Sequence, residues 1–90
     1  MDLLARIESI FTELNFKEVH VNRQKLYEYN GHYYFVSFVK GLNSYVIESA
    51  ENLSEAETNM FEDSGVYPLT LGENELLRVI RADLIQFYIN

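Results

Sequence analysis

The chain has 90 residues, no cysteine and a formal net charge of −7 at pH 7. Ninety residues leave room for one hydrophobic core, so we expect a single domain over residues 1–90. The lack of cysteine excludes disulfides, thiolate nucleophiles and cysteine-based zinc sites, and without a signal peptide or an apolar run of membrane-spanning length it favours a cytoplasmic protein.

The chain is expected to begin with a helix and to continue in extended conformation. Apolar side chains recur at the spacing of one helical face over residues 2–14, and Asn15 can take the left-handed conformation that ends the helix. Residues 17–29 alternate between apolar and polar side chains, as in a half-buried strand. Polar residues 23–25 interrupt this alternation, which predicts a bend or bulge there.

Two further strands are predicted in the middle of the chain. Asn30 and Gly31 both tolerate positive φ, so this pair predicts a tight hairpin turn. Residues 32–39 are aromatic or β-branched at both odd and even positions, which indicates a strand covered on both faces or facing a partner. A turn at residues 41–43 then leads into a third strand over residues 44–50.

Two helices are predicted in the last third. The segment from Ser54 to Glu57 fits a capping box, which predicts a short helix to about Asp63 that Gly65 stops. A connector and then a helix over residues 73–88 follow. The residues expected to face inward in the short helix are Ala56, Met60 and Phe61. Those expected to face inward in the last helix are Leu76, Leu77, Ile80, Leu84, Phe87 and Tyr88.

This α-β-β-β-α-α order predicts an α+β fold, with a three-stranded antiparallel meander and the helices packed on one face. Over residues 2–63 the order resembles that of double-stranded RNA-binding domains. In that family, lysines at the start of the second helix contact phosphates. Here the corresponding residues include Glu55 and Glu57, whose carboxylates would repel a phosphate backbone. We therefore expect no direct binding of nucleic acid.

The negative charge is concentrated in one part of the chain. Residues 41–77 hold eight acids and no base, whereas residues 1–40 hold five of each. One interpretation is a solvated surface, because acids at the starts of helices are favoured by the helix dipole. The other is a docking surface for a basic protein, in which acids steer the encounter. The acids proposed to bind the partner are Glu48, Glu51, Glu55, Glu62 and Asp63.

The predicted strands also carry more aromatic residues than one buried face requires. Seven aromatic side chains lie within residues 27–45. They fit a sheet built from good strand formers, but tyrosine is also enriched at protein interfaces. Tyr33, Tyr34 and Tyr45 are therefore candidate partner-binding residues, and a homodimer through this face is an alternative.

Motifs for catalysis or metal binding are not recognisable in the sequence. Neither His20 nor His32 has a ligand-type residue two or four positions after it, and the four glycines are scattered. We therefore expect no enzyme, no cofactor and no metal. The size, acidity and lack of cysteine resemble those of small bacterial inhibitors such as immunity proteins and antitoxins. The sequence thus predicts a non-enzymatic module that binds a basic protein, with a self-associating structural subunit as the alternative.

Overall fold

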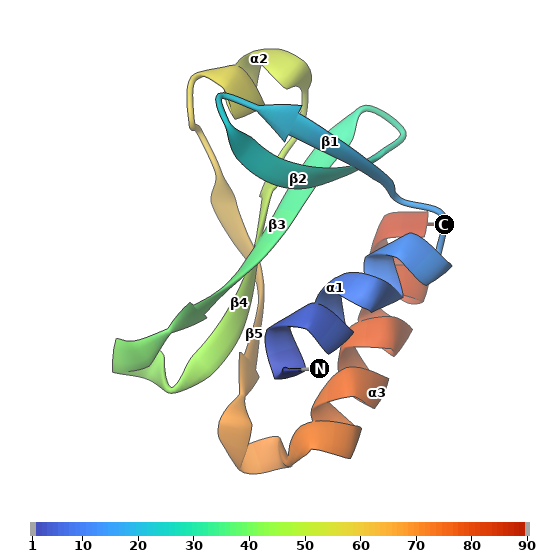
Figure 1. Cartoon of the computed structure of the whole chain (residues 1–90), viewed down its shortest axis with the longest axis vertical. Coiled ribbons are helices and arrows are strands. Elements are labelled where there is room, and N and C mark those ends of the chain that lie inside the picture. Colours follow the sequence, from blue (N-terminus) through green and yellow to red (C-terminus); the bar gives the residue numbers. More distant parts are fainter. Residues whose placement is uncertain (1, 90) are drawn as a thin grey trace.

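The computed structural model describes residues 2–89 and confirms the α+β class (Figure 1). The sheet is an antiparallel five-stranded meander in which each strand pairs with the next along the chain. The helices are α1 (Leu3–Glu13), α2 (Leu53–Glu57) and α3 (Glu73–Asp83), which continues into a π-helical end, η3 (Leu84–Ile89). The strands are β1 (Lys17–Val21), β2 (Gln24–Tyr29), β3 (His32–Val39), β4 (Ser44–Ala50) and β5 (Glu62–Pro68).

The first additional strand arises because residues 17–29 form a hairpin instead of one bent strand. Asn22 and Arg23 both have positive φ, 53° and 67°, so the chain reverses there and β1 pairs with β2. The predicted turn at Asn30 and Gly31 is confirmed, with φ of 53° and 82°. Left-handed conformation at two successive residues is what a tight hairpin with the native twist requires.

The second additional strand, β5, replaces the predicted end of the short helix and the connector after it. The helix α2 ends at Glu57, and Asn59 has a φ of 58°, which the helix cannot accommodate. The N-cap is Asn52 and not Ser54, because the Asn52 side chain accepts a hydrogen bond from the Glu55 amide at 2.8 Å. Met60 is 62% exposed, so its predicted inward position is wrong.

The extra strands also change the comparison with double-stranded RNA-binding domains. Between α1 and α2 the chain forms four strands, β1 to β4, whereas the resemblance requires three. That resemblance in element order therefore does not hold in the structure.

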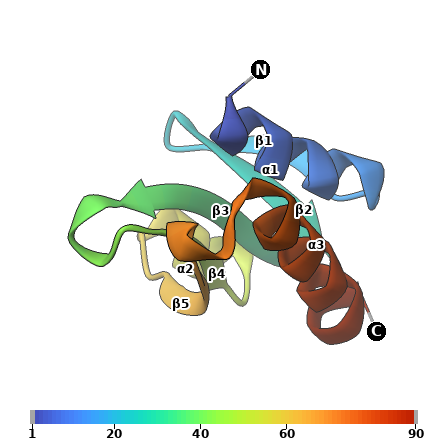
Figure 2. The same ribbon diagram turned by 90° about the horizontal axis from the view of Figure 1, so that it is seen from below.

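The helices α1 and α3 cover one face of the sheet, and α2 covers part of the other (Figures 1 and 2). The prediction that all helices share one face therefore holds for the two long helices only. The main core joins these helices to the first face of the sheet through Ile7, Ile10, Phe11, Tyr27, Tyr34, Val36, Ile47, Tyr67, Leu76, Ile80 and Leu84. A smaller core on the second face centres on Leu26, Ala50 and Ala56.

The π-helical end of the chain alters which side chains face inward. Leu84 is fully buried and Tyr88 packs against the main core, but Phe87 is 62% exposed. A π-helical turn contains more residues than an α-helical turn, so the position three residues after Leu84 rotates away from the core. The predicted inward position of Phe87 is therefore wrong. None of the helices within residues 2–89 has the length and apolarity needed to cross a membrane.

Candidate functional site

The pairing of β4 with β5 brings acids from separate parts of the sequence to one edge of the molecule. In this register Glu48 lies opposite Asp63, and Ser49 lies opposite Glu62. Because directly paired residues share a face of the sheet, Glu48 and Asp63 project from the second face, and Glu62 projects from the first. The five predicted acids therefore form two groups at this edge, Glu48 with Asp63 on one face and Glu62 with Glu51 and Glu55 around a hollow, and we call them together the acidic surface.

Three acids of this surface line a single hollow of about 160 Å³ together with Ser49, which we call the acidic hollow. They are Glu51, Glu55 and Glu62. A carboxylate oxygen of Glu55 accepts a hydrogen bond from the Glu51 amide at 2.9 Å, which orients this side chain at the start of α2. The capping interactions predicted for Ser54 and Glu57 are thus made by Asn52 and Glu55.

The ion pairs of the molecule lie elsewhere. Every salt bridge among residues 2–89 includes a residue of α1 or α3: Arg6–Glu73, Lys25–Glu8, Arg78–Glu75 and Arg81–Glu13. Within the same residues, no member of the acidic surface forms a salt bridge. Bases within residues 2–89 therefore pair with acids on the helical side, whereas the acidic surface forms no such pairs.

Glu48 is held in an electrostatically unfavourable position. Partial burial, and secondly the neighbouring charge of Asp63, raise the pKa of the Glu48 carboxyl above its ordinary value. The ionised form of Glu48 is consequently destabilised in the folded chain. A positive charge placed against this pair would reverse the effect, because it would favour the ionised carboxylate.

A second hollow of about 360 Å³ adjoins the acidic hollow, since Ser49 and Glu51 line both. Its walls come from the β2–β3 turn, β3, β4 and η3, and we call it the aromatic hollow. It is lined by Asn30, His32, Tyr34, Ser49, Glu51, Phe87 and Tyr88. The Tyr88 hydroxyl donates to the Ser64 carbonyl at 3.1 Å, which anchors η3 to β5 and so positions this wall.

The three tyrosines proposed to bind a partner are not brought together. Tyr34 is only 4% exposed and lies in the main core, with its side chain at the edge of the aromatic hollow. Tyr33 projects from the opposite face and packs against the smaller core. Tyr45 stacks edge-on against Phe38, with 5.1 Å between the ring centres. Of the three, only Tyr34 lines a hollow together with an acid of the acidic surface, Glu51.

Sequence reasoning missed the contribution of the chain's last turn. Phe87 and Tyr88 line the aromatic hollow, although both were assigned to the inner face of a regular helix. Residues 84–89 are apolar or aromatic except for Gln86, which is compatible with either an α-helical or a π-helical turn, so the pattern contained no signal for the outward position of Phe87.

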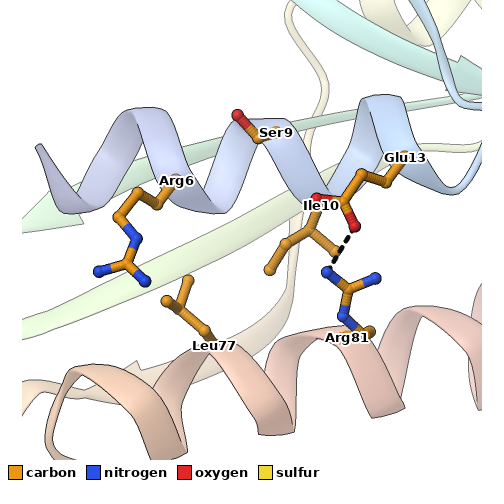
Figure 3. Close-up of a pocket in the computed structure, with 6 residues that line it drawn as sticks. All are labelled: Arg6, Ser9, Ile10, Glu13, Leu77 and Arg81. Carbon is orange, nitrogen blue, oxygen red and sulfur yellow. Dashed lines mark hydrogen bonds and ion pairs between the residues drawn. The ribbon is translucent and has the colours of Figure 1, made fainter. Parts of the chain in front are cut away.

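Another hollow, of about 330 Å³, lies between α1 and α3 (Figure 3). Ile10 and Leu77 line it, and Arg6 and Arg81 stand at its rim. Each arginine is already paired with a carboxylate, Arg6 with Glu73 and Arg81 with Glu13, the latter at 2.6 Å. Because these pairs neutralise both bases, the hollow has no uncompensated positive charge with which to hold an anion.

Among residues 2–89, no group of three or more histidine or acidic side chains is arranged to hold a metal ion. The two hollows of the candidate site are lined by carboxylates, two phenols, the ring of Phe87, the imidazole of His32 and the polar side chains of Asn30 and Ser49. Comparisons with protein-family models, with curated proteins and with solved structures found no match to this chain.

Proposed function

We propose that the chain is a non-enzymatic module that binds a basic protein through the acidic surface. The observation that carries this proposal is the distribution of ion pairs. The salt bridges of the described residues are confined to contacts that involve α1 or α3, while five acids at the β4–β5 edge have no basic partner of their own. Such a concentration of charge steers a basic partner and sets its orientation.

The energetics of Glu48 support the same proposal. Two like charges placed opposite each other across a pair of strands destabilise the fold, and burial adds to the cost for Glu48. A lysine or arginine of a partner would offset this cost when it contacts the pair. A cytoplasmic inhibitor of a basic enzyme or toxin, comparable in size and acidity with immunity proteins and antitoxins, is the form of binding module that best fits these properties.

The proposal is tested by affinity capture from lysate of the source cell with two variants of matched charge. E51Q/E62Q removes two charges from the acidic hollow, and T12K/E18Q raises the net charge by the same amount at exposed residues of α1 and β1. We expect the wild type and T12K/E18Q to retain a basic protein at low salt and to release it at high salt. E51Q/E62Q should not retain this protein even at low salt. Equal retention by both variants would contradict the proposal.

Self-association through the sheet is the alternative function. It is favoured by Val66, which is 48% exposed on the second face of the edge strand β5. A second copy of the chain could bury this area. Sedimentation velocity at low and high protein concentration tests it: a defined dimer that dissociates in V66K would support self-association, and a monomer at every concentration would exclude it.

A further inference from the structure

The hydroxyl of Tyr34, a residue that is 4% exposed, has no hydrogen-bond partner within residues 2–89, unlike the hydroxyls of Tyr67 and Tyr88. Tyr67 donates to the Asp83 carboxylate at 2.8 Å, and Tyr88 donates to the Ser64 carbonyl. Buried phenols usually find such a partner. Every fully buried side-chain polar atom of the described residues is satisfied, so the Tyr34 hydroxyl must keep its access to the aromatic hollow that this residue lines.

The surroundings of this hydroxyl define the chemistry of a ligand. The hollow is lined by one carboxylate, that of Glu51, and by the imidazole of His32, but by no lysine or arginine. Phe87, which is 62% exposed, and Tyr88, whose ring lies 5.1 Å from that of Tyr34, supply aromatic surface. A site with hydrogen-bond acceptors, aromatic faces and negative charge suits a planar cation.

We propose that the aromatic hollow receives an arginine side chain of the basic partner. The guanidinium donates hydrogen bonds to the Glu51 carboxylate and the Tyr34 hydroxyl, and it stacks against Phe87. This inference rests on the proposed function and specifies which residue of the partner is recognised. Arginine fits better than lysine because its planar guanidinium presents five donors and stacks on aromatic rings, whereas an ammonium is a compact, strongly hydrated charge.

The size and the position of the hollow are consistent with this occupant. About 360 Å³ is at the small end of the range of roughly 300–1,000 Å³ typical of ligand sites. Because Ser49 and Glu51 also line the acidic hollow, a second basic residue close in the partner's sequence would reach Glu55 and Glu62. Burial raises the pKa of Tyr34 to about 12, so its hydroxyl stays protonated and able to accept a hydrogen bond at neutral pH.

The test uses two synthetic peptides of equal charge, one of alternating glycine and arginine and one in which lysine replaces every arginine. Binding to the full chain is followed by backbone amide NMR shifts during titration. We expect the wild type to prefer the arginine peptide, with shifts in the aromatic hollow. Y34F and F87A should each weaken arginine-peptide binding by about two- to tenfold and remove most of the preference over lysine.

The matched control is Y33F, which makes the same chemical change at the adjacent residue on the opposite face of the sheet. It should bind both peptides as the wild type does. Y34F should fold normally, because the hydroxyl that it removes has no partner among the described residues.

The outcomes separate the two proposals. If both peptides bind equally, E51Q/E62Q weakens both and Y34F has no effect, the acidic surface binds basic partners but the arginine site is refuted. If neither peptide binds, or E51Q/E62Q binds both as the wild type does, docking through the acidic surface is refuted and the arginine site with it.

Discussion

Replacing Glu48 with glutamine should stabilise the protein at neutral pH, although it removes a charged residue from the interior of a strand. Glu48 lies directly opposite Asp63, and its pKa is raised by burial and by that neighbouring charge. Like charges in directly opposed positions of paired strands cost of the order of 0.2–1 kcal/mol. Glu48 is only half-buried, so solvent screening places the gain near the middle of this range, at about 0.5 kcal/mol. For a domain of this size, that gain corresponds to an increase in Tm of about 2–4 °C.

The gain must depend on pH in a definite direction. A carboxyl whose pKa is raised by folding binds its proton more tightly in the folded state than in the unfolded state. The stabilisation of the folded state by this tighter proton binding is therefore complete below the unfolded pKa of about 4.3. It is lost as the pH rises through the folded pKa. Glutamine resembles the protonated acid at every pH. E48Q should therefore be more stable than the wild type at pH 7 and equally stable in acid below that unfolded pKa.

Urea unfolding at neutral and acidic pH, followed by circular dichroism, measures this difference. D63N should give a similar but smaller gain, and E48Q/D63N should gain less than the sum of the single variants, because either change removes the same repulsion. E18Q is the control, since Glu18 lies opposite Tyr27 instead of an acid. A wild type at least as stable as E48Q at pH 7, or a gain that persists unchanged in acid, would refute the reasoning.

Three further predictions concern the fold. G65A should destabilise the chain by about 1–3 kcal/mol in urea unfolding, because an added Cβ would lie 2.6 Å from the hydroxyl of buried Tyr67. An unchanged unfolding midpoint would show that the Tyr67 ring can move aside at no cost. R23G should raise the free energy of unfolding by about 0.5–1 kcal/mol in the same assay, because Arg23 has a φ of 67° that glycine adopts without strain. A lower free energy of unfolding would contradict the observed turn. L84A should cost about 2–5 kcal/mol in thermal unfolding, because Leu84 is fully buried, whereas a cost below about 1 kcal/mol would place η3 outside the core.

Local patterns were sufficient where neighbours in sequence determine the conformation. The apolar spacing of α1 and α3 matched real helices because each buries one continuous stripe against the sheet. The turn at Asn30 and Gly31 was predicted from residues that tolerate positive φ. The equivalent turn at Asn22 and Arg23 was missed, because arginine is not a residue that ordinarily marks a left-handed position.

Local patterns failed for β5, which depends on a distant partner. Residues 62–68 include two acids, a glycine and a proline, a composition that disfavours a strand by itself. The segment is extended because its backbone pairs with β4 and because Tyr67 packs into the main core. Only tertiary contacts supply that stabilisation, so the sequence pattern indicated a helix end and a connector instead.

The candidate site divides in the same way. The amino-acid sequence by itself determined that negative charge is concentrated in residues 41–77, because charge depends on composition alone. The tertiary structure decided which of those acids act together: Glu73 and Glu75 form salt bridges, whereas the register of β4 and β5 gathers the acidic surface at one edge. It also placed the unpartnered hydroxyl of Tyr34 beside Glu51 and Phe87. That juxtaposition joins segments from three distant parts of the chain, and only the packing of η3 against the sheet brings them together.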